Sequence, residues 1–191
     1  MNEIIFAQEK YSTTITDEIF KIRHEAFIER LQWEITSEGG MERDRFDDIE
    51  AHHIAVRSPD GVIGGCWRAL PTTSDYMLRS VFPELLQGEA LPEEENVWEI
   101  SRFAVRKGSS KSVQGYMSSV TIDLVRSFGE FAERNGIKNY VAVTTVACER
   151  LLRQLGVSIR RLGEGNSLQI GKERSVALWI KVDDNLRVCN A

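Results

Sequence analysis

The chain has few cysteines, and they lack the spacing of a disulfide framework or a zinc site. Cys66, Cys148 and Cys189 stand far apart and form no C-x-x-C pair. They are therefore interpreted as reduced thiols, and we expect no metal. The adjacent histidines His52 and His53 do not alter this expectation, because neighbouring strand residues face opposite ways and packing at a strand edge is commoner than metal ligation.

The sequence also lacks long hydrophobic runs and an excess of basic residues. No apolar run approaches the length of a membrane span and residues 1–10 carry no export signal, so we expect a cytoplasmic protein without a membrane partner. The formal net charge of −5 argues against wholesale nucleic-acid binding. Gly-rich phosphate loops of the G-x-x-x-x-G-K-S/T and G-x-G-x-x-G types are absent, which disfavours binding of nucleotides through those motifs.

The 191 residues are enough for one domain with a sizeable core. Residues 32–50 form a polar stretch with embedded aromatics, which is typical of a functional loop or lid. Strands are expected over residues 3–7, 54–56, 62–70, 98–103, 140–144 and 176–182, and helices from Thr14 to Leu31 and over 77–86, 113–135 and 149–155. Strands that alternate with helices predict an α/β layered domain with a mixed sheet.

The segment 98–103 (Trp-Glu-Ile-Ser-Arg-Phe) carries the strongest signal for chemistry. Strand alternation sends Glu99, Ser101 and Phe103 to one face. An ionisable group among apolar residues is costly unless it has a partner. Glu99 and Arg102 therefore indicate either a structural ion pair or a catalytic carboxylate, and the segment alone leaves both readings open.

A second charged segment contains Asp44 and Asp47, which are three residues apart. If this segment is one turn of helix, the two carboxylates can converge on a cationic amine. Arg23 upstream offers a fork for a carboxylate, and Phe27 and Trp33 offer aromatic faces for a cation. Taken singly, Phe27 is typical of a core residue, and a loop aspartate is typical of a helix cap.

Five ordered blocks together resemble the acyl-homoserine-lactone synthases of bacterial quorum sensing, the autoinducer synthase family. The blocks are Arg23-x-x-x-Phe27-x-x-x-x-x-Trp33, Asp44-x-x-Asp47, Gly65-Cys66-Trp67-Arg68-x-Leu70-x-Thr72-Thr73, the segment 98–103, and Val143-Thr144-Thr145 followed by Glu149-Arg150. The resemblance implies an α/β, single-domain, GNAT-like three-layer fold over residues 1–191, with a mixed, mostly antiparallel sheet flanked by helices. It also implies a mobile, substrate-covering region at about residues 1–50.

The activity implied by the resemblance is synthesis of an N-acyl-homoserine lactone from S-adenosylmethionine and an acyl carrier protein thioester. S-adenosylmethionine is a substrate, so no cofactor is expected. Glu99 is then the candidate base for the substrate amine, and Ser101 helps to place the reacting groups. Arg102, with Arg23, steers the charged groups of the substrate or braces the two aspartates.

The remaining site residues follow from the same resemblance. Those expected to bind S-adenosylmethionine are Arg23, Phe27, Trp33, Asp44, Asp47, Arg68 and Phe103. Those expected to line the acyl pocket are Met77, Met117, Val143, Thr144 and Leu152. Those expected to dock the acidic carrier protein are Arg150 and Arg153, within a stretch 150–174 that has six basic and two acidic residues. That stretch alone is equally typical of an ordinary solvated surface.

Two other functions stay open. One is an acyl-CoA-dependent small-molecule N-acyltransferase of the GNAT type, although the pyrophosphate loop Gln/Arg-x-x-Gly-x-Gly/Ala is missing from residues 106–115. A CoA thioester could also be the donor within the synthase family itself. The other is a binding module that senses an adenosyl ligand, which would tolerate loss of Glu99 but not of Trp33 or Asp44. Acyl chain length and 3-oxo preference are not readable.

Overall fold

The computed structural model describes residues 1–8, 13–48, 50–108, 112–113 and 117–187. The strands are β1 (Glu3–Gln8), β2 (Ser37–Glu38), β3 (Met41–Glu42), β4 (His52–Arg57), β5 (Ile63–Pro71), β6 (Val97–Val105), β7 (Ser112–Val113), β8 (Met117–Ser118), β9 (Asn139–Thr145), β10 (Ile159–Arg161), β11 (Leu168–Ile170) and β12 (Glu173–Lys181). The helices are α1 (Thr13–Arg23), the π-helix η2 (His24–Arg30), η3 (Arg45–Asp47), α2 (Met77–Ser80), η4 (Pro83–Leu86), α3 (Ser119–Asn135), α4 (Val146–Gln154) and α5 (Asp184–Arg187).

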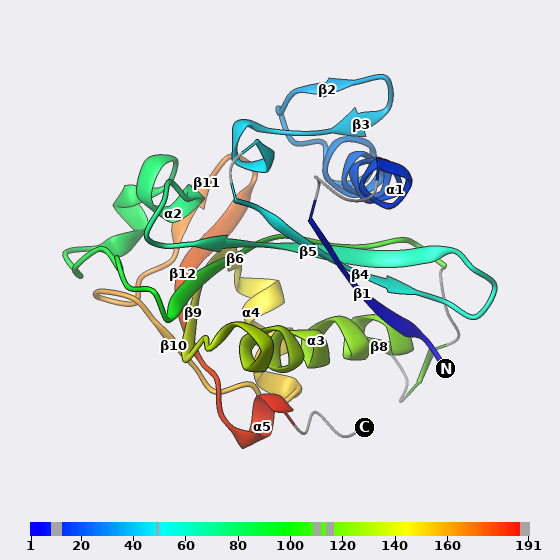
Figure 1. The fold of residues 1–191 in the computed structure, drawn as a ribbon. Helices are drawn as coiled ribbons and strands as arrows, with labels where there is room; N and C mark the ends of the chain where they lie inside the picture. The colour runs from blue at the N-terminus through cyan, green and yellow to red at the C-terminus, as the bar shows by residue number, and fades with distance from the viewer. Residues whose placement is uncertain (9–12, 49, 109–111, 114–116, 188–191) are drawn as a thin grey trace. The chain divides into compact units, whose positions relative to one another are not determined.

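The main sheet is mixed and mostly antiparallel, as predicted (Figure 1). Its strand order is β1-β4-β5-β6-β9-β12-β10, and β11 also pairs with β12. The pair β6–β9 is parallel, whereas β1–β4, β4–β5, β9–β12 and β10–β12 are antiparallel. The chain divides into two compact units, Met1–Ala69 with Arg102–Ser127 and Leu70–Ser101 with Phe128–Ala191. We describe each unit by itself.

In the first unit, helices cover both faces of β5. Cys66 faces α1 and η2 in an apolar cluster with Ile19, Phe20, Ile22, Ala26, Phe27, Ala55, Ile63 and Ala104. Each large apolar side chain buried there contributes about 1.5–3 kcal/mol. Gly65 and Trp67 face α3, where Trp67 Nε1 donates to Ser127 Oγ at 2.8 Å and a Cβ on Gly65 would lie only 2.7 Å from Leu124 Cδ1. Helix, sheet and helix therefore form the expected three layers.

In the second unit, β9 lies between two partners. It runs parallel to the first half of β6, with Glu99 opposite Val141, and antiparallel to β12. The hydroxyl of Tyr140 donates to the carbonyl of Phe128 at 2.8 Å, which joins β9 to the end of α3. Thr145 ends β9 and caps α4, because its side chain accepts the backbone N–H of Cys148 at 3.2 Å.

Two expected helices have different bounds in the structure. The helix predicted over residues 113–135 begins at Ser119 instead, because the Ser118 hydroxyl accepts the N–H of Thr121 and so caps the helix there. The helix predicted to run to Leu31 changes at His24 into a π-helix, whose wider turn is seen where the N–H of Leu31 bonds the carbonyl of Ala26 at 3.1 Å.

The other differences concern short elements. The expected loop 32–50 contains the two-stranded β2–β3 sheet and the single turn η3. The short strands β10 and β11 were not predicted, because three residues are too few to show a period. No described helix is long and apolar enough to span a bilayer. The mobility expected for the region of about residues 1–50 stays a prediction.

Candidate functional site

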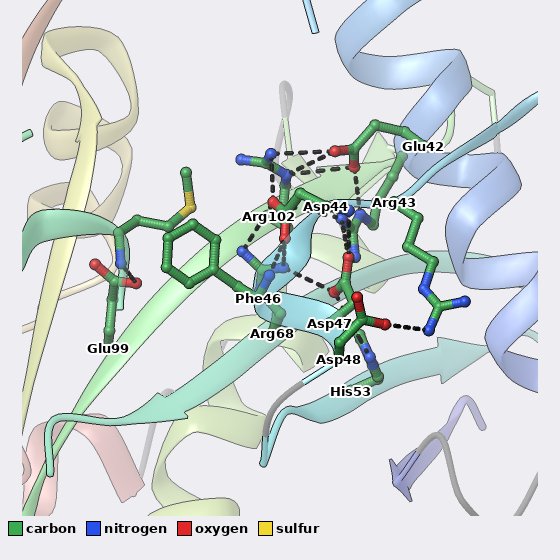
Figure 2. Close-up of polar contacts among 12 residues, drawn as sticks. Glu42, Arg43, Asp44, Phe46, Asp47, Asp48, His53, Arg68, Glu99 and Arg102 are labelled. Atoms are coloured by element: carbon green, nitrogen blue, oxygen red, sulfur yellow. Dashed lines mark hydrogen bonds and ion pairs between the residues drawn. The ribbon is translucent and has the colours of Figure 1, made fainter. Parts of the chain in front are cut away.

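A cluster of six charged side chains lies in the first unit (Figure 2). Five elements contribute to it: the end of α1, β3, the η3 turn, β5 and β6. Its members, here called the ion cluster, are Arg23, Glu42, Asp44, Asp47, Arg68 and Arg102. Three guanidinium groups thus meet three carboxylates, which matters because a buried charge without a partner costs several kcal/mol.

Asp44 and Asp47 lie on one helical turn, which is the local structure that the predicted convergence on a ligand requires. Asp44 caps η3 by accepting the N–H of Phe46 at 2.9 Å, and the Asp47 side chain accepts the N–H of Asp44 at 2.8 Å. This reciprocal capping box fixes the backbone between them. The carboxylates are therefore caps of the turn and members of the ion cluster at once.

Asp47 is sealed inside the ion cluster. Arg23 donates to both of its oxygens, at 2.8 and 2.9 Å, and Arg68 Nη1 donates to Oδ1 at 2.7 Å. Burial would raise the pKa of Asp47, but the positive charges of Arg23 and Arg68 outweigh burial and hold this pKa well below its usual range. The side chains of Asp47 and Arg68 are 0% exposed and that of Arg23 is 1% exposed, so these three residues brace the site.

Glu42 is a member that sequence reasoning missed. Its Oε2 accepts Arg23 Nε at 2.5 Å and its Oε1 accepts Arg102 Nη2 at 3.1 Å, while the residue is buried. In the sequence, Glu42 is one of several charged residues in a polar stretch. No spacing sets it apart, because its partners lie 19 and 60 residues away.

Arg102 and Asp44 form the exposed edge of the ion cluster. The Asp44 side chain is 20% exposed and that of Arg102 is 8% exposed, and Arg102 Nη2 lies 2.7 Å from Asp44 Oδ2. Burial lowers the pKa of Arg102, and its neighbours Glu42 and Asp44 oppose that effect. The backbone of Arg102 has a φ of +54°, which interrupts the regular pleat of β6. The common face expected for Glu99 and Phe103 stays a prediction.

The two predicted aromatic residues stack on each other. The rings of Phe27 and Trp33 lie 4.7 Å apart at 17°, and the guanidinium of Arg102 lies 5.6 Å from the Phe27 centroid. Phe27 is buried in the apolar cluster and Trp33 is half-buried against it. Trp33 is the one of the two that retains exposed surface for a ligand.

Glu99 lies in the second unit and is 1% exposed. Its carboxylate accepts the backbone N–H groups of Met77, at 2.9 Å, and Leu78, at 2.7 Å. It therefore holds the first turn of α2 in place. In the first unit, Arg102 pairs with Glu42 and Asp44. Ser101, on β6 between them, is half-buried.

His53 is a buried neighbour of the ion cluster. It pairs across the sheet with Arg68, and its Nε2 lies 3.8 Å from Asp47 Oδ1. Neither ring nitrogen has a hydrogen-bond partner within the described residues. Burial lowers the pKa of His53 to about 4, although Asp47 acts in the opposite direction. Among the described residues, no group of three His, Cys, Asp or Glu side chains is arranged to hold a metal ion.

Four of the five predicted acyl-pocket residues lie on three elements of the second unit. Met77 is in α2, Leu152 is in α4, and both helices contact β9. Val143 and Thr144 are neighbours on β9, so their side chains point to opposite faces of the sheet. The side chain of Met117 lies outside the described residues. These positions do not test whether the residues line an acyl pocket, so that assignment stays a prediction.

The two predicted docking arginines differ in their surroundings. Both are exposed on α4. Arg153 pairs with Glu149 at 3.0 Å, and Arg161 pairs with the other Glu149 oxygen at 2.7 Å. Within the part of the chain that the structure describes, Arg150 forms no ion pair, so its charge is the more available to a partner.

Comparison with known proteins gives one consistent result. A family model described as autoinducer synthase matches residues 7–188. The acyl-homoserine-lactone synthase of Aliivibrio fischeri ES114 is 40% identical over 169 residues, which are 88% of this chain and 87% of that protein.

Solved structures agree with this result. The crystal structure of TofI in a ternary complex with an inhibitor and MTA (methylthioadenosine) has a TM-score of 0.82 and 32% identity, covering 98% of this chain and 95% of TofI. BjaI, a CoA-dependent acyl-homoserine lactone synthase solved with SAM (S-adenosylmethionine) and isopentyl-CoA, has a TM-score of 0.87 at 21% identity, covering 99% of this chain and 88% of BjaI. The BjaI likeness shows the shared fold.

The surroundings of His53 lead to a pH-dependent stability. In the unfolded chain its imidazole has the ordinary pKa of 6.5, whereas the folded value is about 4. Stability is therefore full above pH 6.5 and falls as the pH drops towards 4, because only the unfolded state gains the proton. The difference corresponds to about 3 kcal/mol. We expect His53→Leu to lose this part of the pH dependence, measured by urea unfolding at pH 4.5 to 7.5.

The matched control is His24→Gln, which changes a partly exposed histidine of the same unit. It should keep the wild-type slope between pH 6.5 and 4.5. Parallel curves for wild type and His53→Leu would contradict the buried, neutral state of His53.

Proposed function

This chain belongs to the autoinducer synthase family, and we propose that it joins S-adenosylmethionine to an acyl group carried by an acyl carrier protein. It is an acyl-homoserine-lactone synthase with the GNAT-like fold of its relatives. The observation that carries the substrate assignment is the ion cluster, which is sealed except at Asp44 and Arg102. That edge offers one carboxylate and one guanidinium, the two partners of a methionyl ammonium and carboxylate.

The half-buried ring of Trp33 supports the same assignment. A tryptophan face attracts cations and packs well against flat rings, and both a sulfonium and an adenine occur in S-adenosylmethionine. Phe27 backs Trp33 from inside the apolar cluster. Arg23, Arg68 and Asp47 then hold Asp44 and Arg102 in place.

The first chemical step is amide formation. The α-amine has a pKa of about 8, so much of it is protonated near neutral pH and must lose a proton to become nucleophilic. Glu99 is the proposed acceptor, directly or through water. The amine nitrogen attacks the thioester carbonyl, the N–C bond forms, and the C–S bond breaks to release the carrier thiol.

The second step closes the lactone. A carboxylate oxygen of the acylated methionyl group attacks Cγ, and the bond from Cγ to the sulfonium breaks with its electron pair going to sulfur. The products are the acyl-homoserine lactone and neutral methylthioadenosine. Because this step is intramolecular, alignment alone can supply an effective molarity of about 10⁵ M or more. Positioning is therefore the main task of the site.

Acyl carrier protein and CoA present the same phosphopantetheine thioester, so the reaction chemistry does not distinguish the two acyl donors. The exposed and unpaired Arg150 on α4 favours an acidic protein partner. A CoA thioester is the alternative, since a synthase of this fold is described as CoA-dependent.

We expect purified protein to release methylthioadenosine from S-adenosylmethionine with acyl carrier protein thioesters, one molecule for each lactone formed. The same acyl groups on CoA should give a kcat/KM at least about tenfold lower, because they lack the docking contact. Chromatography of methylthioadenosine and mass spectrometry of the lactone measure both. Equal rates with CoA would overturn the donor assignment, and binding of S-adenosylmethionine without any turnover would indicate a sensor module.

Glu99→Gln tests the proposed base. We expect turnover to fall by about 10²-fold or more, while the KM for S-adenosylmethionine changes little, because the substitution keeps the side-chain shape but removes the proton acceptor. Glutamine replaces one of the carboxylate oxygens that accept Met77 and Leu78 with an N–H donor, so stability should also fall by about 1–3 kcal/mol.

Glu89→Gln is the matched control for that loss of stability. Glu89 lies in the same unit, also accepts a backbone N–H, from Gly163, and lies outside the proposed S-adenosylmethionine site. It also pairs with Arg160, so the control is judged by stability and by the KM for S-adenosylmethionine. If Glu99→Gln lowers turnover and the affinity for S-adenosylmethionine equally, Glu99 is not the base.

Arg150→Glu tests the docking surface. We expect the KM for the acyl carrier protein to rise about tenfold at low salt, with little change in kcat and none in the KM for an acyl-pantetheine, which has no protein to dock. Lys138→Glu reverses an exposed charge of the same unit outside the 150–174 stretch and serves as the control. An unchanged KM for the acyl carrier protein would show that Arg150 is not part of the docking surface.

A further inference from the structure

Arg102 holds an unfavourable backbone conformation at the exposed edge of the ion cluster. Its φ of +54° lies in the left-handed region, which costs free energy for any residue with a Cβ and persists only where the surroundings enforce it. Its guanidinium donates to Glu42 Oε1 from Nε, at 3.2 Å, and from Nη2, at 3.1 Å. The same group lies over the Phe27 ring. Glu42 therefore contacts the Arg102 guanidinium at two of its nitrogens and helps to fix its position.

Glu42 joins the sealed part of the ion cluster to this edge. Its second oxygen accepts Arg23 Nε at 2.5 Å, and the Glu42 side chain is 1% exposed. Glu42 therefore does not reach a ligand itself. It ties Arg102 to Arg23, whose own side chain is 1% exposed and fixed on Asp47.

The charge of Glu42 also affects how strongly the arginines of the ion cluster attract the Asp44 carboxylate. Asp44 already accepts Arg68 Nη1 at 2.6 Å and faces Arg102 Nη2 at 2.7 Å. With Glu42 ionised, three carboxylates balance three guanidinium groups. Without its charge, Asp44 and Asp47 alone would face all three arginines, and the edge would become net positive.

We propose that Glu42 is a positioning residue for S-adenosylmethionine: it holds Arg102 and balances its charge, so that Asp44 keeps negative potential for the cationic end of the substrate. This inference rests on the proposed function and assigns no contact between Glu42 and the ligand. Its consequence is selective. Loss of the Glu42 charge weakens binding of a cationic ligand more than that of a neutral ligand with the same adenosyl group.

Methylthioadenosine is that neutral ligand, because it lacks the sulfonium charge and the amino-acid group. The experiment measures the Kd of both ligands by calorimetry for wild type and Glu42→Gln. We expect the Kd for S-adenosylmethionine to rise about tenfold, as one nearby charge at a partly exposed site can do, and the Kd for methylthioadenosine to stay within about twofold of the wild-type value. A role limited to folding would weaken both ligands alike.

Two further variants sharpen the comparison. Glu42→Asp keeps the charge but shortens the reach, so its ratio of the two Kd values should lie between those of wild type and Glu42→Gln. It also replaces Glu42→Gln should that variant not fold. Glu25→Gln removes a carboxylate partner of Arg106 in the same unit but outside the ion cluster, and should leave the ratio unchanged.

The possible results distinguish failure of the Glu42 role from failure of the proposed function. Equal losses for both ligands, or no loss for S-adenosylmethionine, would overturn the role of Glu42 while leaving the synthase activity intact. Wild-type protein that fails to bind S-adenosylmethionine would overturn the proposed function and the role of Glu42 with it.

Discussion

The first unit depends on the mutual neutralisation of three buried arginines and three carboxylates. None of the sealed charges is tolerable alone, because removing the partner of a buried charge costs about 3–5 kcal/mol. Arg23 ends α1, Glu42 lies in β3 and Arg68 lies in β5, so each pairing also fixes one element against another. The η3 turn depends on it as well, since Asp44 and Asp47 cap that turn with the same carboxylates that face the arginines. Fold and site thus share one set of interactions.

The sequence predicted those parts of this arrangement that have a period or a short-range signal. The strand over 62–70 and the helical turn at Asp44 and Asp47 follow from spacing within a few residues, and both are present in the structure. Convergence of the two carboxylates on a ligand stays a prediction. Glu42 was missed because its significance lies in partners 19 and 60 residues away. The π-helix from His24 and the positive φ of Arg102 were missed because tertiary packing enforces them against local preference.

Burial changes the roles that residue type alone suggested. Arginine and aspartate in a substrate-binding pattern suggest ligand contacts, yet Arg23, Arg68 and Asp47 are sealed and contact Asp44 instead. Glu99 likewise has a structural task, because it holds the backbone amides at the start of α2. A catalytic carboxylate fixed by two amides has little freedom to move, which is what an oriented proton acceptor requires.

The ion cluster also suits a reaction in which the substrate loses its positive charge. An isolated carboxylate beside the substrate ammonium would bind the cation tightly and would resist its deprotonation, because that attraction is lost when the amine gives up its proton. Asp44 is not isolated, since Arg68 and Arg102 share its charge. Arginine stays protonated at any working pH. The pKa of Asp47 lies well below its usual range, and that of His53 is about 4. The charge states of the arginines, Asp47 and His53 therefore do not change near neutral pH. The α-amine of the substrate, with a pKa of about 8, is then the group whose protonation changes there. Under the proposed function, the balanced cluster would orient a cationic substrate with modest attraction and leave the pH dependence of the reaction to the substrate amine and its proton acceptor.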